Sequence, residues 1–372
     1  MRNFLLFQIA LCLAALAVFQ LAQPAGASHP LQSDDPASRG EYLATIAGCT
    51  SCHTPDKPEY QDPASMTFEQ VQTIAFEGNL AMDTSKLLAG GRAFPLGPAG
   101  VVYTKNITMD EETGIGLWTD EQIKLAIKSG VTPEGEVLFP VMPYHVYNGM
   151  ADADLDDIIA YLKSLPPVRN EVPERTVSTE GMPVLPYQDR ITAPDPADPS
   201  SRGAYLVNHI MGCADCHTPI DPNTGAPMME MDLAGRQPYE GPWGIVYGGN
   251  ITPHDETGIG TWTDEEVKRA LLAGIGKDGR RLILMPWYAY SALTPEDADA
   301  VVYYLKNDLP AVDNQIPAAS LNPDFMVVLP AQEFATPTQS PLTSPWILVA
   351  AAVFIVGAVS AGFWLFNKRR NG

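Results

Sequence analysis

The chain of 372 residues contains a long segment of itself twice. The stretch Ser38–Pro55, "SRGEYLATIAGCTSCHTP", matches Ser201–Pro219, "SRGAYLVNHIMGCADCHTP", with one residue inserted. The block "GGRAFPLGPAGVVYTKNIT" from Gly90 then aligns without a gap with "AGRQPYEGPWGIVYGGNIT" from Ala234. The match continues through "ETGIG" and "WTDE" to the end of each copy. Self-similarity of this extent predicts two copies of one module rather than one large domain.

Each copy is predicted to be helical. Thr119 with Gln122, and Thr263 with Glu266, form capping boxes that begin a second helix in each copy. Thr294 begins the last helix of the second copy as an N-cap. Apolar residues at helical spacing share one face of the last helices: Leu155, Ile158, Ile159 and Leu162, then Ala298, Val301, Val302 and Leu305. Gly- and Pro-rich segments between the helices favour extended loops over strands.

The two ends of the chain differ from the rest. Residues 1–27 combine Arg2, an apolar run that includes Cys12, and small residues before Ser28, which indicates an export signal. An uncleaved anchor is the alternative. Residues 346–366 carry no charge and are long enough to cross a bilayer. The basic tail 367–372 that follows is expected to stay on the cytoplasmic side.

These observations divide the chain into segments. We expect a signal peptide at 1–27, a first domain at 35–168 and a second at 200–312. Proline-rich spacers at 169–199 and 313–345 would connect the domains to each other and to a transmembrane helix at 346–366. The formal charge of −21 disfavours nucleic acid and anionic lipid as partners, and it would attract basic proteins or simply maintain solubility.

Four of the five cysteines lie in the pattern C-x-x-C-H. The two sets are Cys49, Cys52 and His53 in the first copy, and Cys213, Cys216 and His217 in the second. This pattern is the attachment signature of c-type haem: the two thiols add to the two vinyl groups of a porphyrin, and the histidine binds the iron. Each histidine should donate its other ring N–H to a backbone carbonyl. We therefore predict two covalently bound haem c groups.

Other uses of paired cysteines remain possible. A zinc site could join the two pairs, although each pair lies in its own copy. A thioredoxin-like redox pair would need a βαβ context, which the sequence lacks. Ordinary disulfides are compatible with export.

The second axial ligand of each iron must come from elsewhere in its copy. Met142 in "VMPY" and Met285 in "LMPW" occupy matching places between the second and last helices, and a thioether ligand raises the haem potential. A methionine can also be core filler. His145, His209 or His254 could instead give a bis-histidine centre.

Four further residues align between the copies. Arg92 and Arg236 could pair with haem propionates, and Trp118 and Trp262 could pack at the haem edge. The alternative for all four is a structural role repeated with the fold.

At these residues the chain resembles a known family. "NIT", "ETGIG", "WTDE" and "MPY" around the two C-x-x-C-H motifs resemble the cytochrome c subunit of membrane-bound alcohol, aldehyde and gluconate dehydrogenases. The resemblance implies an all-α fold of two tandem class I-like cytochrome c domains, here with one C-terminal transmembrane helix. It places haem attachment at the four motif cysteines and axial ligation at His53, Met142, His217 and Met285. The chain has two C-x-x-C-H motifs where that subunit usually has three.

The expected function is electron transfer rather than catalysis. A dihaem c-type cytochrome, anchored to the bacterial inner membrane by one helix, would carry electrons on the periplasmic side. Its partners would be a dehydrogenase or quinol-oxidising donor and a respiratory acceptor such as a cytochrome c or an oxidase. One alternative is a dihaem enzyme, a peroxidase or a sulfur-compound oxidase, with one open iron. Another is a permanent subunit of a larger complex.

Overall fold

The computed structural model describes residues 35–61, 65–182 and 184–322. The predicted signal peptide, transmembrane helix and basic tail lie outside these residues. Within the described ranges, no helix has the length and apolar character needed to cross a membrane. The first copy contains the helices α2 (Pro36–Ile46), α3 (Cys49–His53), α4 (Phe68–Glu77), α5 (Asp120–Ser129), α6 (Tyr144–Tyr147) and α7 (Asp152–Ser164). The second copy contains α8 (Pro199–Tyr205), α9 (Ala214–His217), α10 (Asp264–Ala273), α11 (Trp287–Tyr290) and α12 (Pro295–Asn307).

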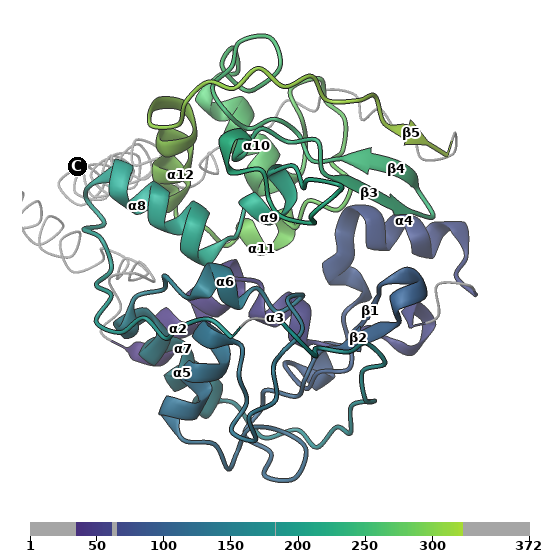
Figure 1. The fold of residues 1–372 in the computed structure, drawn as a ribbon, viewed down its shortest axis with the longest axis vertical. Coiled ribbons are helices and arrows are strands. Elements are labelled where there is room, and N and C mark those ends of the chain that lie inside the picture. The colour runs from purple at the N-terminus through teal and green to yellow at the C-terminus, as the bar shows by residue number, and fades with distance from the viewer. Residues whose placement is uncertain (1–34, 62–64, 183, 323–372) are drawn as a thin grey trace, which may run out of the picture. The chain divides into compact units, whose positions relative to one another are not determined.

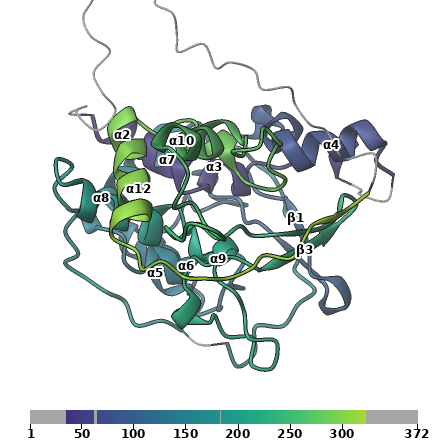
Figure 2. The same cartoon turned by 90° about the horizontal axis from the view of Figure 1, so that it is seen from above.

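In each copy the first helix packs against the last. Helix α2 lies against α7, and α8 lies against α12, as Figures 1 and 2 show for the second pair. A glycine allows each close approach. A Cβ atom on Gly40 would lie 1.9 Å from the carbonyl oxygen of Asp157, and one on Gly203 would lie 2.0 Å from that of Ala300. The repeated "SRG" of the sequence therefore encodes the contact between the first and last helices of each copy.

The single residue inserted in the second copy changes its first helix locally. Helix α8 continues into a π-helical turn over Leu206–Ile210 before the chain reaches the second cysteine motif. A π turn accommodates one extra residue within a helix. The insertion is thus absorbed upstream of the motif.

The all-α prediction is correct for the helical framework but misses two small antiparallel sheets. Strands β1 (Ala93–Pro95) and β2 (Val101–Tyr103) form the first. Strands β3 (Pro238–Gly241), β4 (Gly244–Tyr247) and β5 (Ser320–Leu321) form the second. Strands of two to four residues are too short to show the alternating pattern by which a strand is recognised in sequence. The last strand comes from the segment predicted as a spacer.

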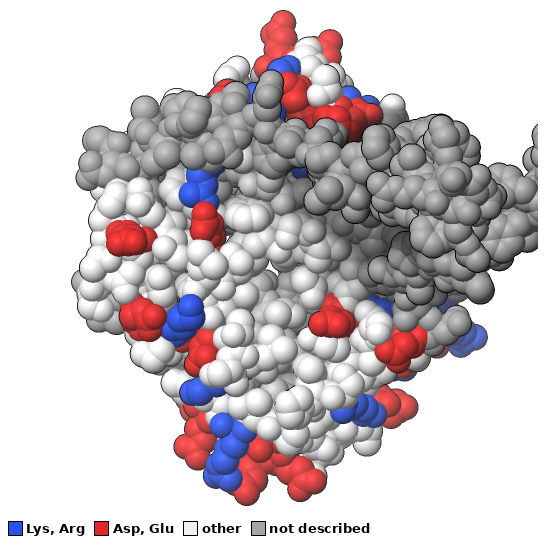
Figure 3. Space-filling view, turned by 180° about the vertical axis from the view of Figure 1, so that it is seen from behind, with Lys and Arg blue, Asp and Glu red and all other residues white. Residues whose placement is uncertain are grey.

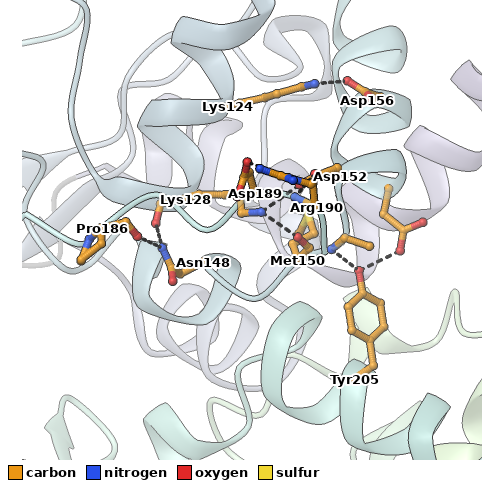
Figure 4. Close-up of polar contacts among 12 residues, drawn as sticks. Lys124, Lys128, Asn148, Met150, Asp152, Asp156, Pro186, Asp189, Arg190 and Tyr205 are labelled. Carbon is orange, nitrogen blue, oxygen red and sulfur yellow. Dashed lines mark hydrogen bonds and ion pairs between the residues drawn. The ribbon is translucent and has the colours of Figure 1, made fainter. Parts of the chain in front are cut away.

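The segment predicted as a spacer between the copies has no regular structure, but it is fixed to the first copy. The side chain of Lys128 is fully buried, and its Nζ donates to Met150 O at 3.0 Å and to Asp152 Oδ1 at 3.1 Å. The other carboxylate oxygen of Asp152 accepts from the backbone N–H of Arg190 at 2.6 Å. Figure 4 shows this group. A buried ammonium satisfied in this way binds the connecting chain to the end of α5.

In each copy, an asparagine just after the last helix hydrogen-bonds back to the segment before the first strand. Asn170 Nδ2 donates to Ala89 O at 3.0 Å, and Asn314 Nδ2 donates to Ala234 O at 3.0 Å. The contacts of each repeat thus continue beyond residues 168 and 312.

The two copies join through equivalent residues that exchange partners. Tyr42 Oη of the first copy donates to Asp297 Oδ2 of the second at 2.5 Å, and Tyr205 Oη of the second donates to Asp154 Oδ2 of the first at 2.8 Å. Arg202 completes one of these sites with two hydrogen bonds of 2.8 Å to Asp297. One continuous hydrophobic core contains buried residues from both copies. The interface therefore has the reciprocal contacts of a two-fold dimer.

We predict that Tyr42→Phe lowers the free energy of unfolding by about 2 kcal/mol, because it removes a hydrogen bond to a buried carboxylate. Denaturant titration of the purified protein measures this value. Tyr303→Phe is the control, since that side chain is 42% exposed. Equal stabilities of the two variants would contradict a contribution from the exchanged tyrosine.

Candidate functional site

Both cysteine motifs begin at a glycine in the left-handed region. Gly48 has φ +82° and Gly212 has φ +61°, values that a residue with a side chain adopts only under strain. The turn ends the first helix of each copy and starts a short one, α3 or α9. Cys52 N then donates to Gly48 O at 2.9 Å, so that the two thiols of the motif stand one helical turn apart. Within the described residues, no disulfide joins any of the four motif cysteines.

The two motif histidines are oriented by the same contact. His53 Nδ1 lies 2.7 Å from Lys105 O, and His217 Nδ1 lies 2.7 Å from Gly249 O. A carbonyl only accepts, so Nδ1 carries the proton and Nε2 keeps its lone pair for a metal. Burial lowers the pKa of both histidines, against an opposing effect of the carbonyl bond, and this favours the neutral ligand form. The expected carbonyl partner is confirmed in both copies.

The surroundings of the thiols suit a porphyrin. Burial is the main cause that raises the pKa of Cys49 to about 12 and that of Cys213 to about 12, so both sulfurs lie in apolar surroundings. Thiols one turn apart beside a neutral imidazole form the donor set of haem c. Among the described residues, no group of three or more His, Cys, Asp or Glu side chains is placed to hold a metal ion.

Met142 and Met285 occupy equivalent loops. Each lies between the second long helix of its copy and a short helix, α6 or α11, and each packs partly buried against the main core. Each carbonyl accepts from the N–H two residues later at 2.8 Å, namely that of Tyr144 or Trp287. The loops thus share one local geometry, while the ligand role of the two methionines remains a prediction.

The histidines considered as alternative ligands have protein partners. His145 Nε2 lies 2.7 Å from Asp215 Oδ1, and His209 Nδ1 lies 3.3 Å from Val146 O. His254 Nδ1 accepts from the N–H of Thr257 at 3.2 Å within a turn.

The two aligned arginines have different surroundings. Arg92 forms an ion pair with Asp56, with Nε 3.1 Å from Asp56 Oδ2, and its Nη1 donates to Ser51 O inside the first cysteine motif at 2.6 Å. Arg236 is exposed, and it is not the structural equivalent of Arg92. The N–H of Thr104 donates to Arg92 O, whereas the equivalent N–H of Gly248 donates to Gln237 O. The second copy therefore has Ile220 and Gln237 where the first copy has Asp56 and Arg92. Arg92 therefore stabilises the attachment turn of its own copy, and a role with propionates stays a prediction for both.

The aligned tryptophans, Trp118 and Trp262, are partly buried against the main core. This placement agrees with a packing role. Contact of either indole with a haem edge remains a prediction.

Two tyrosines beside the motifs were missed in the sequence. Tyr147 Oη donates to Ala47 O at 2.5 Å, and Tyr290 Oη donates to Met211 O at 3.1 Å. In both copies the acceptor is the residue before the left-handed glycine. The sequence did contain a pattern that could have identified them, because each tyrosine follows the repeated methionine of its copy by five residues.

Comparison with known proteins confirms the resemblance seen in the sequence. The chain is 28% identical to the fructose dehydrogenase cytochrome subunit of Gluconobacter japonicus over 289 residues, which are 73% of this chain and 52% of that subunit. It is 27% identical to the gluconate 2-dehydrogenase cytochrome c subunit of Pantoea cypripedii over 72% of this chain and 58% of that subunit. It is 28% identical to a diheme cytochrome c-type protein of Cereibacter sphaeroides over 81% of this chain and 98% of that protein.

The three relatives are named as cytochrome subunits of dehydrogenases or as a diheme cytochrome c. The chain is therefore related to cytochrome subunits of dehydrogenases and to a dihaem cytochrome c. The chain spans about half the length of the two dehydrogenase subunits named above. No model of a known protein family matches the chain.

We predict that Asp56→Asn lowers the free energy of unfolding by on the order of 3 kcal/mol, because it leaves the largely buried Arg92 without its anion. Arg236→Gln, a change at an exposed arginine of the second copy, is the control and should change the stability little. Denaturant unfolding measures both variants. A neutral result for Asp56→Asn would show that the pair does not stabilise the attachment turn.

Proposed function

We propose that the protein is a dihaem c-type cytochrome that transfers electrons on the periplasmic side of the bacterial inner membrane. One haem c would be attached at each cysteine motif, in domains near 35–168 and 200–312 that resemble class I cytochromes c. The predicted helix 346–366 would anchor them. The observation that carries the proposal is the repeated histidine–carbonyl contact beside each thiol pair, which leaves one ring nitrogen free for iron.

When bound, each haem supplies an iron that cycles between the ferric and ferrous states. The side chains of the protein would attach each porphyrin and bind its iron. Cys49 and Cys52 would fix one porphyrin and Cys213 and Cys216 the other, while His53 and His217 would bind iron through Nε2. Met142 and Met285 would complete the ligand sets and leave no position for a substrate. The protein therefore acts as a relay, which accepts one electron from a donor and passes one electron to an acceptor.

The donor we propose is a dehydrogenase or quinol-oxidising subunit, since the relatives are named as cytochrome subunits of dehydrogenases. The acceptor would be a component of the respiratory chain, such as a cytochrome c or an oxidase. On the face shown in Figure 3, Asp and Glu side chains lie at both the upper and the lower end of the view, with Lys and Arg among them, and most of the residues between are uncharged. The formal charge of −21 favours a basic partner, and added salt would slow that association.

The first prediction concerns haem content. Protein produced with a cytochrome maturation system should have a mass that exceeds its polypeptide by two haems. The variant Cys49→Ala/Cys52→Ala should retain one, and so should Cys213→Ala/Cys216→Ala, because each pair attaches its own group. Intact-mass spectrometry gives the count. An unmodified mass for the parent protein would refute the proposal.

The second prediction concerns the axial methionines. Met142→Ala and Met285→Ala should each lower the potential of one haem and let carbon monoxide bind to that ferrous iron, because a thioether ligand both raises the potential and blocks the site. Redox and CO titrations followed by absorbance measure both effects. Rapid CO binding by the unsubstituted protein would instead support a dihaem enzyme with one open iron.

A further inference from the structure

Helix α4 belongs to the first copy but packs against the second. It lies in the segment between Pro55 and Gly90, which is much longer than the equivalent segment between Pro219 and Ala234. Figure 1 shows α4 beside β3 and β4, away from α2, α5 and α7 of its own copy. Its buried residues Val71, Ala75 and Phe76 form a separate apolar cluster, against which Trp243 and Ile283 of the second copy pack.

The end of α4 is hydrogen-bonded to the loop that carries Met285. The backbone N–H of Leu284 donates to Ala75 O at 3.0 Å, and Trp287 Nε1 donates to Phe76 O at 2.8 Å. Carbonyls in the last turn of a helix have no partner within the helix. Two of these carbonyls in α4 are satisfied by donors immediately before Met285 and two residues after it. The methionine thus lies between two points fixed to the first copy.

A charged contact strengthens the same junction. Arg281 Nη2 lies 2.5 Å from Glu77 Oε1, and its guanidinium lies over the ring of Phe76 at 4.6 Å. A cation is also favoured at the C-terminal end of a helix, where the helix dipole is negative. Helix α4 has no basic residue in its own last turn, and Arg281 of the second copy supplies one.

The other side of the loop is also attached to the first copy. The Tyr288 ring lies against the residue that follows α4, since a Cβ atom on Gly78 would lie 3.2 Å from Tyr288 Oη. Burial raises the pKa of Tyr288, and the positive charge of Arg92 offsets part of that rise. Leu284 has φ +64°, a strained value for a residue with a side chain, so this conformation requires support from its surroundings.

The Met142 loop has no equivalent attachment. Its chain aligns Val137 with Arg281 and Tyr144 with Trp287, so it lacks both the cation and the indole donor. It closes instead on itself, with Met142 N donating to Phe139 O at 3.0 Å. The two methionine loops therefore share local geometry but differ in their contacts with the other copy. The Met285 loop is attached to α4, whereas the helix after Met142 is attached through His145, whose Nε2 lies 2.7 Å from Asp215 Oδ1.

We propose that α4 is a positioning helix for Met285, so that the ligand loop of the second haem site is held closed by the first copy. This inference rests on the proposed function, in which Met285 binds the second iron. Loss of the α4 contacts should let the loop open and expose that iron to external ligands, while the first site stays unchanged.

The experiment compares Arg281→Gln and Trp287→Phe with Arg280→Gln in the full-length holoprotein. Arg280 is adjacent, and its side chain is 66% exposed, which makes it a matched control. The readouts are imidazole binding to the ferric protein and the far-red charge-transfer band of methionine-ligated ferric haem. Met142→Ala and Met285→Ala assign the signals to the two sites. Amide hydrogen exchange over residues 281–288 gives a readout that does not depend on haem.

Arg281→Gln and Trp287→Phe should each bind imidazole at the second site about tenfold more tightly than Arg280→Gln, as expected for the loss of one or two hydrogen bonds. Exchange over residues 281–288 should be faster by a similar factor. If both variants matched Arg280→Gln while Met285→Ala opened the second site, the positioning role of α4 would be wrong and the ligand assignment would stand. If Met285→Ala opened neither site, the proposed ligand role would fail, and the inference with it. Arg281→Gln conserves the indole and its packing, so the test survives if Trp287→Phe folds poorly.

Discussion

The structure depends on one set of contacts, the exchange of tyrosine and aspartate between the two copies. Asp154 and Asp297 are almost completely buried, and each accepts a hydroxyl from the opposite copy. A buried carboxylate without its partners is strongly unfavourable. Arg39 and Arg202 pair with these aspartates within their own copies, so separation of the copies would remove the tyrosine hydroxyls and expose both ion pairs. The shared hydrophobic core would be exposed as well. The duplicated chain behaves as a covalent dimer, with its copies fixed relative to each other.

This fixed arrangement determines what the cysteine motifs can do. The short helices α6 and α11 carry Tyr147 and Tyr290 to the turns that precede the motifs, and the loops before them carry the two methionines. Contacts also cross between copies at this level, as with His145 of the first and Asp215 of the second motif. A rigid junction would keep the two proposed haem sites at one separation and orientation, which suits the proposed electron relay better than two domains on a flexible spacer.

The sequence predicted the parts of this structure that are encoded locally. The duplication, the capping boxes at Thr119 and Thr263, the last helix of each copy and the histidine–carbonyl contacts follow from short patterns with a direct physical cause. Three features could not be predicted in this way: the Asp56–Arg92 pair, the buried Lys128 and the role of α4. Their partners lie far away in the chain, and no local sequence pattern indicates them. Segment 169–199 has the composition of a linker, and its lack of regular structure was predicted. Its contacts with the first copy were not predicted, because their partners also lie far away in the chain.

Duplication makes two equal sites, and the differences between the copies then show where the sites have diverged. In the first copy, Asp56 and Arg92 stiffen the attachment turn, whereas the second copy has Ile220 and Gln237 at these places. In the second copy, the methionine loop has external support from α4, whereas the loop of the first copy closes on itself. The first site is thus reinforced at its attachment turn and the second at its methionine loop. Because the potential of a haem depends on axial ligation and on the surrounding charge and burial, two sites reinforced on different sides need not share a potential, and a difference between them would give the relay a direction.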